Sequence, residues 1–67
     1  MTKFVVEIRL GNDALPENLT EAAPELARIL ADVAYKLENT EMTTWPLRDI
    51  NGNTVGRAGL RTDEGEP

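Results

Sequence analysis

The sequence predicts a small α+β domain with the chain order βαββ, in which one helix packs on one face of a three-stranded antiparallel sheet. Three observations carry this prediction: an alternating stretch at residues 3–10, an apolar stripe with helical spacing at residues 24–38, and an Asn-Gly turn within residues 45–60. A strand–helix–strand crossover leaves its two strands parallel, and the hairpin then reverses the chain. The third strand therefore fits between the other two, in the order 1-3-2.

Residues 3–10 are predicted to form a strand with one buried face, because apolar and polar side chains alternate along them. One face carries Phe4, Val6, Ile8 and Leu10, and we expect it to lie on the helix. The other face carries Lys3, Val5, Glu7 and Arg9. With only one helix predicted, nothing in the chain is expected to cover this outer face.

The helix offers the largest apolar surface of the chain. Its apolar side chains recur at intervals of three and four residues, which places them on one stripe: Leu26, Ile29, Leu30, Val33, Ala34 and Leu37. We expect the helix to begin at Pro24, because proline suits the first helical position, whereas a cap at Thr20 would place it in the fourth. It should end near Glu38 or Asn39, since Asn tolerates the left-handed cap conformation. Leu30, in mid-stripe, is expected in the core.

Residues 45–49 and 54–60 are predicted to pair as a hairpin, and Pro46 indicates an edge strand or a strand end because it lacks an N–H. Two turns fit the Asn-Gly signal. A two-residue loop at 51–52 would pair residue 50 with 53. A three-residue loop at 50–52, with Gly52 in the left-handed region, would pair Leu47 with Val55 and residue 49 with 53. We prefer the second, because it places two apolar side chains opposite each other.

The last strand is expected to contain a bulge. Val55 and Leu60 have opposite parity, so both can face the core only if Gly56 or Gly59 interrupts the alternation. Residues 1–60 are then one domain, and residues 61–67 form an acidic tail that we expect to be disordered.

The amino-acid composition excludes several classes of function and site. The 67 residues include no Cys and no His, which excludes disulfides and the usual zinc sites. Serine is absent too, so we expect no enzyme and no cofactor. Asp49, Asn51 and Asn53 alternate like the first ligands of a calcium loop, but Thr54 and Leu60 stand where that loop needs Gly and Glu. We therefore expect these three to be turn formers and the chain to hold no metal.

The net charge of −5 disfavours nucleic-acid binding, and Arg9, Arg48 and Arg57 are too few and too diluted by acids to reverse that expectation. No apolar run reaches the length of a membrane span, and no signal peptide is apparent. The sequence therefore predicts a cytoplasmic protein with no membrane association.

Two strings, residues 7–14 (Glu-Ile-Arg-Leu-Gly-Asn-Asp-Ala) and 48–56 (Arg-Asp-Ile-Asn-Gly-Asn-Thr-Val-Gly), resemble a set of short proteins from actinobacteria and their bacteriophages. The resemblance covers about residues 3–60. This chain has a longer connector before Pro24, and Arg57-Ala58-Gly59 where an aromatic residue is usual. The resemblance implies the same fold and a phage or mobile-element setting, and it assigns no chemistry.

These observations favour a non-catalytic interaction module that binds a host or phage protein. One alternative is an acidic nucleic-acid mimic that inhibits a DNA-binding host or defence protein, and another is a β-ribbon DNA-binding regulator. We also expect a weak homodimer, formed through the open sheet face or an edge strand. The candidate interface residues are Val5, Glu7, Arg9, Trp45 and Arg48. For Trp45, core packing is favoured over an interface role.

Overall fold

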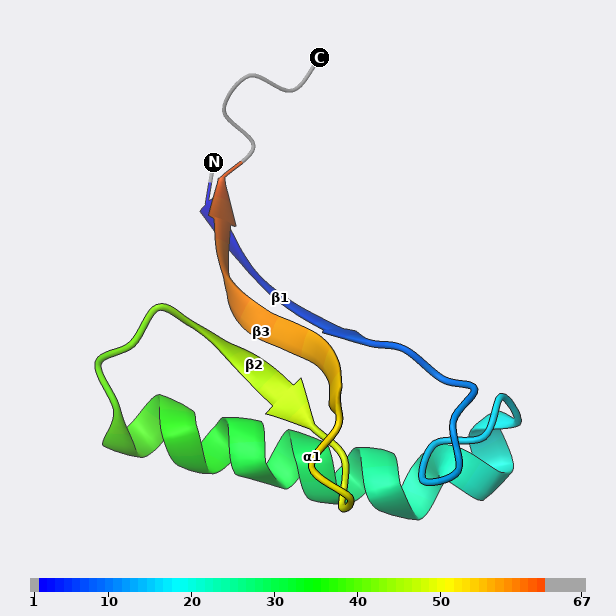
Figure 1. Ribbon diagram of the computed structural model, residues 1–67. Helices are drawn as coiled ribbons and strands as arrows, with labels where there is room; N and C mark the ends of the chain where they lie inside the picture. The colour runs from blue at the N-terminus through cyan, green and yellow to red at the C-terminus, as the bar shows by residue number, and fades with distance from the viewer. Residues whose placement is uncertain (1, 63–67) are drawn as a thin grey trace.

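The computed structural model describes residues 2–62 and confirms the βαββ order. The elements are β1 (Thr2–Ile8), α1 (Leu19–Asn39), β2 (Thr44–Arg48) and β3 (Thr54–Thr62). The sheet is antiparallel throughout, and its strand order β1-β3-β2 is the predicted one. α1 lies along one face of the sheet (Figure 1), and no other described element covers the opposite face.

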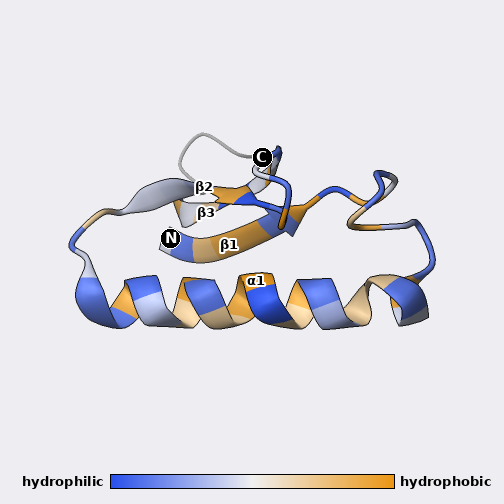
Figure 2. Ribbon diagram, turned by 60° about the horizontal axis from the view of Figure 1, so that its bottom comes forward, coloured by the Kyte–Doolittle hydropathy of each residue, from blue (hydrophilic) through white to orange (hydrophobic). Residues whose placement is uncertain are grey.

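The core lies between α1 and the β2–β3 side of the sheet. Its buried apolar side chains are Leu15, Ala22, Ile29, Val33, Trp45, Leu47, Val55 and Ala58. Figure 2 shows the sheet and α1 as two layers, with apolar residues along β1. This strand is covered less well: Val6 and Ile8 are half-buried, and Phe4 is 40% exposed, with its ring 6.0 Å from that of Trp45. The packing is therefore uneven: side chains beneath β2 are buried, whereas those beneath β1 are only partly covered.

The buried stripe of α1 is rotated from the predicted one. Ala22, Ile29 and Val33 are buried, whereas Leu30 is 48% exposed and Leu37 is 55% exposed. The expectation that Leu30 lies in the core is wrong. Six apolar residues spread over more of the helix circumference than one small sheet can cover, and the exposed ones lie on the flank away from β2.

The helix also begins earlier than expected, at Leu19. Asn18 is the N-cap, and its side chain accepts a hydrogen bond from the Glu21 N–H at 3.2 Å. Pro24 therefore lies inside the helix, where it removes only one backbone hydrogen bond. The predicted start at Pro24 is therefore wrong. The Asn18 cap and the burial of Ala22 stabilise the first turns and offset the cost of an internal proline.

The end of α1 at Asn39 is confirmed, but its capping differs. Thr40 follows in extended conformation (φ −140°), and its N–H donates to the Lys36 carbonyl at 2.9 Å. Among the described residues only glycines have positive φ. The expected left-handed cap at Asn39 is therefore wrong.

The three-residue hairpin loop at 50–52 is confirmed. Gly52 has a φ of +85°, and the Asp49 N–H donates to the Asn53 carbonyl at 2.9 Å. The register beyond the loop differs, because Leu47 lies opposite Gly56 and not opposite Val55. The irregularity falls between Leu47 and Arg48, so Val55 is the additional residue of the bulge.

This bulge buries Val55 and leaves Leu60 51% exposed. The bulge falls directly beside Gly56, one of the two expected positions, and it reverses the alternation: Leu60 lies opposite Phe4 on the helix side of the sheet, although it is not buried there. β3 continues to Thr62, so Arg61 and Thr62 belong to the sheet and not to a tail. The rest of the predicted tail, residues 63–67, lies outside the described residues.

Candidate functional site

Asp49, directly after β2, is the only charged residue among residues 2–62 that is buried, at 4% exposure. Its Oδ1 accepts from the N–H groups of Asn51 and Asn53, each at 2.9 Å. Its Oδ2 accepts from the side-chain amides of Asn12 at 2.8 Å and Asn53 at 3.3 Å. Both oxygens are therefore occupied by donors from the hairpin and from the connector after β1. The calcium-like alternation is explained as turn structure.

The environment of two carboxyls shifts their acidity. Burial raises the pKa of Asp49, but hydrogen bonds from Asn53, Asn51 and Asn12 lower it more, and the net pKa lies below its usual value. The hydrogen bond from Arg28 lowers the pKa of Glu25; partial burial opposes this shift, and the Ile50 N–H supports it. Both groups are held ionised near neutral pH, so neither is suited to act as a general acid or base there.

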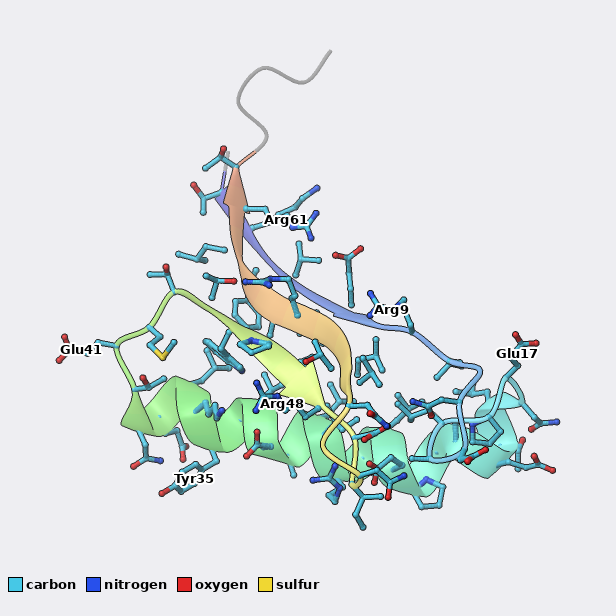
Figure 3. All side chains as sticks on the ribbon, in the orientation of Figure 1. Arg9, Glu17, Tyr35, Glu41, Arg48 and Arg61 are labelled. Carbon is cyan, nitrogen blue, oxygen red and sulfur yellow. The ribbon has the colours of Figure 1, made fainter. Side chains whose placement is uncertain are left out.

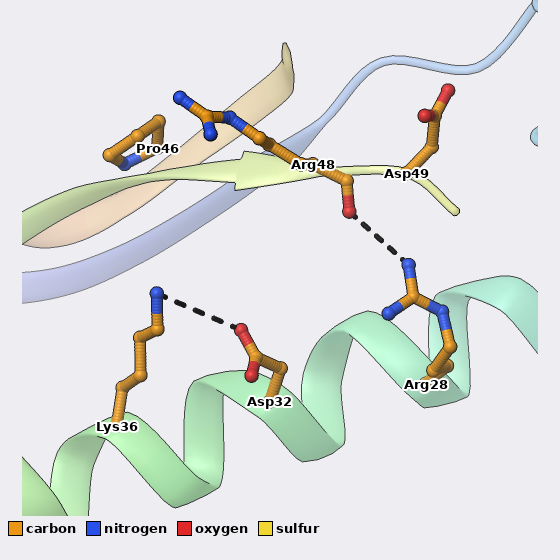
Figure 4. A pocket seen from close by; sticks show the side chains of 6 residues that line it. All are labelled: Arg28, Asp32, Lys36, Pro46, Arg48 and Asp49. Atoms are coloured by element: carbon orange, nitrogen blue, oxygen red, sulfur yellow. Dashed lines mark hydrogen bonds and ion pairs between the residues drawn. The ribbon is translucent and has the colours of Figure 1, made fainter. Parts of the chain in front are cut away.

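A polar cleft of about 280 Å³ lies between α1 and β2 (Figure 4), lined by Arg28, Asp32, Lys36, Pro46, Arg48 and Asp49. Arg28 makes two 2.8 Å bonds to Glu25 and donates to the Arg48 carbonyl at 3.3 Å. The Lys36 ammonium is 4.0 Å from Asp32. Most charges in the cleft are thus paired within the chain. No group of three or more His, Cys, Asp or Glu in residues 2–62 is placed to hold a metal ion.

The open face of the sheet is strongly basic, although the whole chain is acidic. It carries five of the seven basic residues of the chain: Lys3, Arg9, Arg48, Arg57 and Arg61. Only one acidic side chain among the described residues lies with them, Glu7, which forms an ion pair with Arg61. We call this surface the basic face. The two remaining basic residues, Arg28 and Lys36, lie on α1, which also carries four acids: Glu21, Glu25, Asp32 and Glu38.

Strand pairing places these residues next to one another. Glu7 lies opposite Arg57, which lies opposite Pro46 of β2. Lys3 lies opposite Arg61, and the Arg9 guanidinium donates to the Thr54 carbonyl at 3.3 Å. Figure 3 shows Arg9, Arg48 and Arg61 distributed over the three-stranded sheet, away from the Tyr35 side of α1. The basic side chains therefore share one face of the sheet, along or directly after its three strands.

Four of the five candidate interface residues lie on the basic face: Val5, Glu7, Arg9 and Arg48. Trp45 does not, because it is 2% exposed and belongs to the core. The expectation that acids dilute these arginines considered the whole composition, whereas among residues 2–62 Glu7 is the one acid on this face. Arg61 was missed because the strand was expected to end at Leu60. Arg57, Gly59 and Arg61 follow one another at intervals of two residues and pair with outward-facing residues of β1. This spacing is the sequence signal that could have placed Arg61 on the face.

Within residues 2–62, α1 lacks the combination of length and apolar character that crossing a bilayer requires. Comparison with known proteins adds no relationship: no family model matches the chain, and no curated protein or solved structure does so either.

Proposed function

We propose that this protein is a non-catalytic interaction module that binds an acidic surface of another protein through the basic face. The segregation of charge carries the proposal: within residues 2–62, five cations and one carboxylate share the open sheet face of a chain whose net charge is −5. Such a separation costs folding stability through like-charge repulsion and needs a functional reason. An acidic partner would relieve that repulsion.

The chemistry of the face favours protein over nucleic acid. Four of its five cations are arginines, the basic residue enriched at protein interfaces. Val5 and Pro46 provide apolar area among them. Among the described residues, no aromatic side chain lies on the face to stack on bases. The chain as a whole has a pI of about 4.5, whereas nucleic-acid-binding domains are usually basic.

The acids of the remaining surface do not favour the nucleic-acid mimic. Asp49 is buried in the hairpin, Glu25 is bound to Arg28, and Asp32 lies near Lys36. A mimic needs free carboxylates concentrated on one surface. The resemblance to phage and actinobacterial proteins makes a cytoplasmic host or phage protein the partner we propose.

Comparative affinity capture tests the proposal. The immobilised full chain, the Arg57→Gln variant and the Lys36→Gln variant are exposed to nuclease-treated lysate of the organism that encodes the chain. Both substitutions remove one positive charge, but only Arg57 lies on the basic face. We expect at least one acidic protein to bind the wild type and Lys36→Gln, to bind Arg57→Gln at least tenfold less, and to elute at about 0.5 M salt.

Equal capture by all three proteins, or no specific capture, would contradict the proposal. A parallel mobility-shift assay with duplex DNA covers the other class of partner. A salt-sensitive shift that Arg57→Gln abolishes would support the DNA-binding regulator in place of the protein-binding module.

A further inference from the structure

The two edges of the sheet differ in how readily they can pair with another strand. The Leu60 N–H donates to the Thr43 carbonyl at 2.9 Å, so alternate β2 residues Thr44, Pro46 and Arg48 direct their backbone groups outward. Pro46 has no N–H to offer, and the Arg48 carbonyl accepts from Arg28 at 3.3 Å. The β2 edge is therefore protected against pairing.

The β1 edge has no such protection in the described part of the chain. The Arg9 N–H donates to the Val55 carbonyl at 2.7 Å, so the odd-numbered residues of β1 direct their backbone groups toward β3. The even-numbered residues, from Thr2 to Ile8, direct theirs to the outer edge. β1 has seven residues, contains neither proline nor a bulge, and no described strand lies on its outer side (Figure 1).

The geometry points to a second copy of this chain as the partner of this edge, with β1 of each copy paired antiparallel about a two-fold axis at Val5. In this register Lys3 of each copy lies opposite Glu7 of the other, and the whole of Thr2–Ile8 is paired. Moving the axis to Phe4 loses both opposite-charge pairs. Moving it to Val6 places Lys3 opposite Arg9, which is repulsive. The charges of β1 are therefore self-complementary in one register.

The thin packing beneath β1 supports the same partner. Phe4 is 40% exposed, and in the joined sheet it lies opposite Val6 of the second copy, with the backbone groups of both directed at each other. The exposed flank of α1 with Leu30 and Leu37 is the flank away from β2, on the side of this edge.

Pairing would extend the sheet to six strands and join the two basic faces. Because one strand pair buries little area, we expect a dissociation constant of about 0.1–1 mM.

Charge exchange tests the register. Lys3→Glu places like charges opposite each other in the homodimer, and Glu7→Lys does the same with the opposite sign. Each variant alone should sediment as a monomer at about 1 mM, whereas their equimolar mixture should form a heterodimer at least as tight as wild type. Glu38→Lys is the control for Glu7→Lys, because it makes the same change of charge at an exposed site on α1. This control should dimerise like wild type.

Cysteine cross-linking at Val5 tests the register with both charge pairs retained, and the chain has no native cysteine to compete. Opposing Val5 residues form a non-hydrogen-bonded pair about 4.5 Å apart between Cα atoms, within disulfide range. Val5→Cys should therefore cross-link at least tenfold faster than Lys3→Cys or Glu38→Cys. A wild type that stays monomeric at about 1 mM, a mixture that fails to associate, or equal cross-linking at all three sites would each overturn the inference.

Discussion

The Asn12 side-chain amide donates a 2.8 Å hydrogen bond to the Asp49 carboxylate, across 37 positions of sequence. The same Asn12 accepts the Leu15 N–H at 2.7 Å through its Oδ1. One side chain thus joins the connector after β1 to the hairpin between β2 and β3, and orients the loop that carries the fully buried Leu15. Residues 7–14 and 48–56 meet at this hydrogen bond, which gives Asn12 and Asp49 a structural role.

Removal of this link should be measurable. Asn12→Ala loses two hydrogen bonds and leaves one oxygen of a buried carboxylate with one donor fewer, so we expect the free energy of unfolding to fall by about 1–3 kcal/mol. Asn39→Ala serves as the control, because it loses a side-chain bond to the Tyr35 carbonyl at an exposed site. It should cost less than about 0.5 kcal/mol. Equal losses in urea titrations of the two variants would contradict a structural role for Asn12.

Stability should depend on pH through the same site. The pKa values of Asp49 and Glu25 are lowered in the folded chain from ordinary values of 3.8 and 4.5. A lowered pKa contributes stability that is fully present above the ordinary value and lost as pH falls through the folded value. The urea midpoint should therefore be flat from about pH 7 to pH 5 and fall below about pH 4. Asp49→Asn should be less stable at neutral pH and lose less on acidification; an unchanged acid slope would count against this account.

The fold could be read from the sequence because its signals are local and agree with one another. Alternation in β1, the Asn51-Gly52 turn and the proline in β2 each depend on short-range geometry. The two main errors concern choices that tertiary packing makes. Contact with the sheet selects which part of a wide apolar stripe is buried, and β3 bulges beside Gly56, where it approaches the β1 backbone closely.

The candidate site was only partly accessible from the sequence. Strand parity places Val5, Glu7 and Arg9 together, because alternation along one strand needs no register. The contribution of β3 depends on the bulge, which no short-range pattern encodes, and on where that strand ends, which the alternation of Arg57, Gly59 and Arg61 indicates only together with the pairing to β1. The basic face could not be predicted from composition, because net charge does not report how charges are distributed over the surface.

The approach of β3 to β1 requires glycine at position 56. A Cβ on Gly56 would lie 1.8 Å from the Glu7 carbonyl oxygen, which is backbone and cannot move without separating the strands. We expect Gly56→Ala to cost more than about 3 kcal/mol, at the upper end of overpacking effects. Gly52→Ala meets no atom within 4 Å but must keep a φ of +85°, so it should cost about 1–2 kcal/mol. Thermal unfolding that ranks Gly52→Ala as the more damaging variant would contradict the observed strand contact.

The rotation of α1 can be tested at two adjacent positions. Ile29 is 2% exposed and packs in the core, whereas Leu30 is 48% exposed on the flank toward β1. Ile29→Ala should therefore cost about 2–5 kcal/mol of unfolding free energy and leave so small a domain largely unfolded. Leu30→Ala should cost less than about 1 kcal/mol, since alanine also favours the helix. Circular dichroism during urea titration below about 20 µM, where the proposed dimer is dissociated, measures both without the second copy. A larger loss at Leu30 than at Ile29 would restore the helix face expected from the apolar stripe and contradict the packing described above.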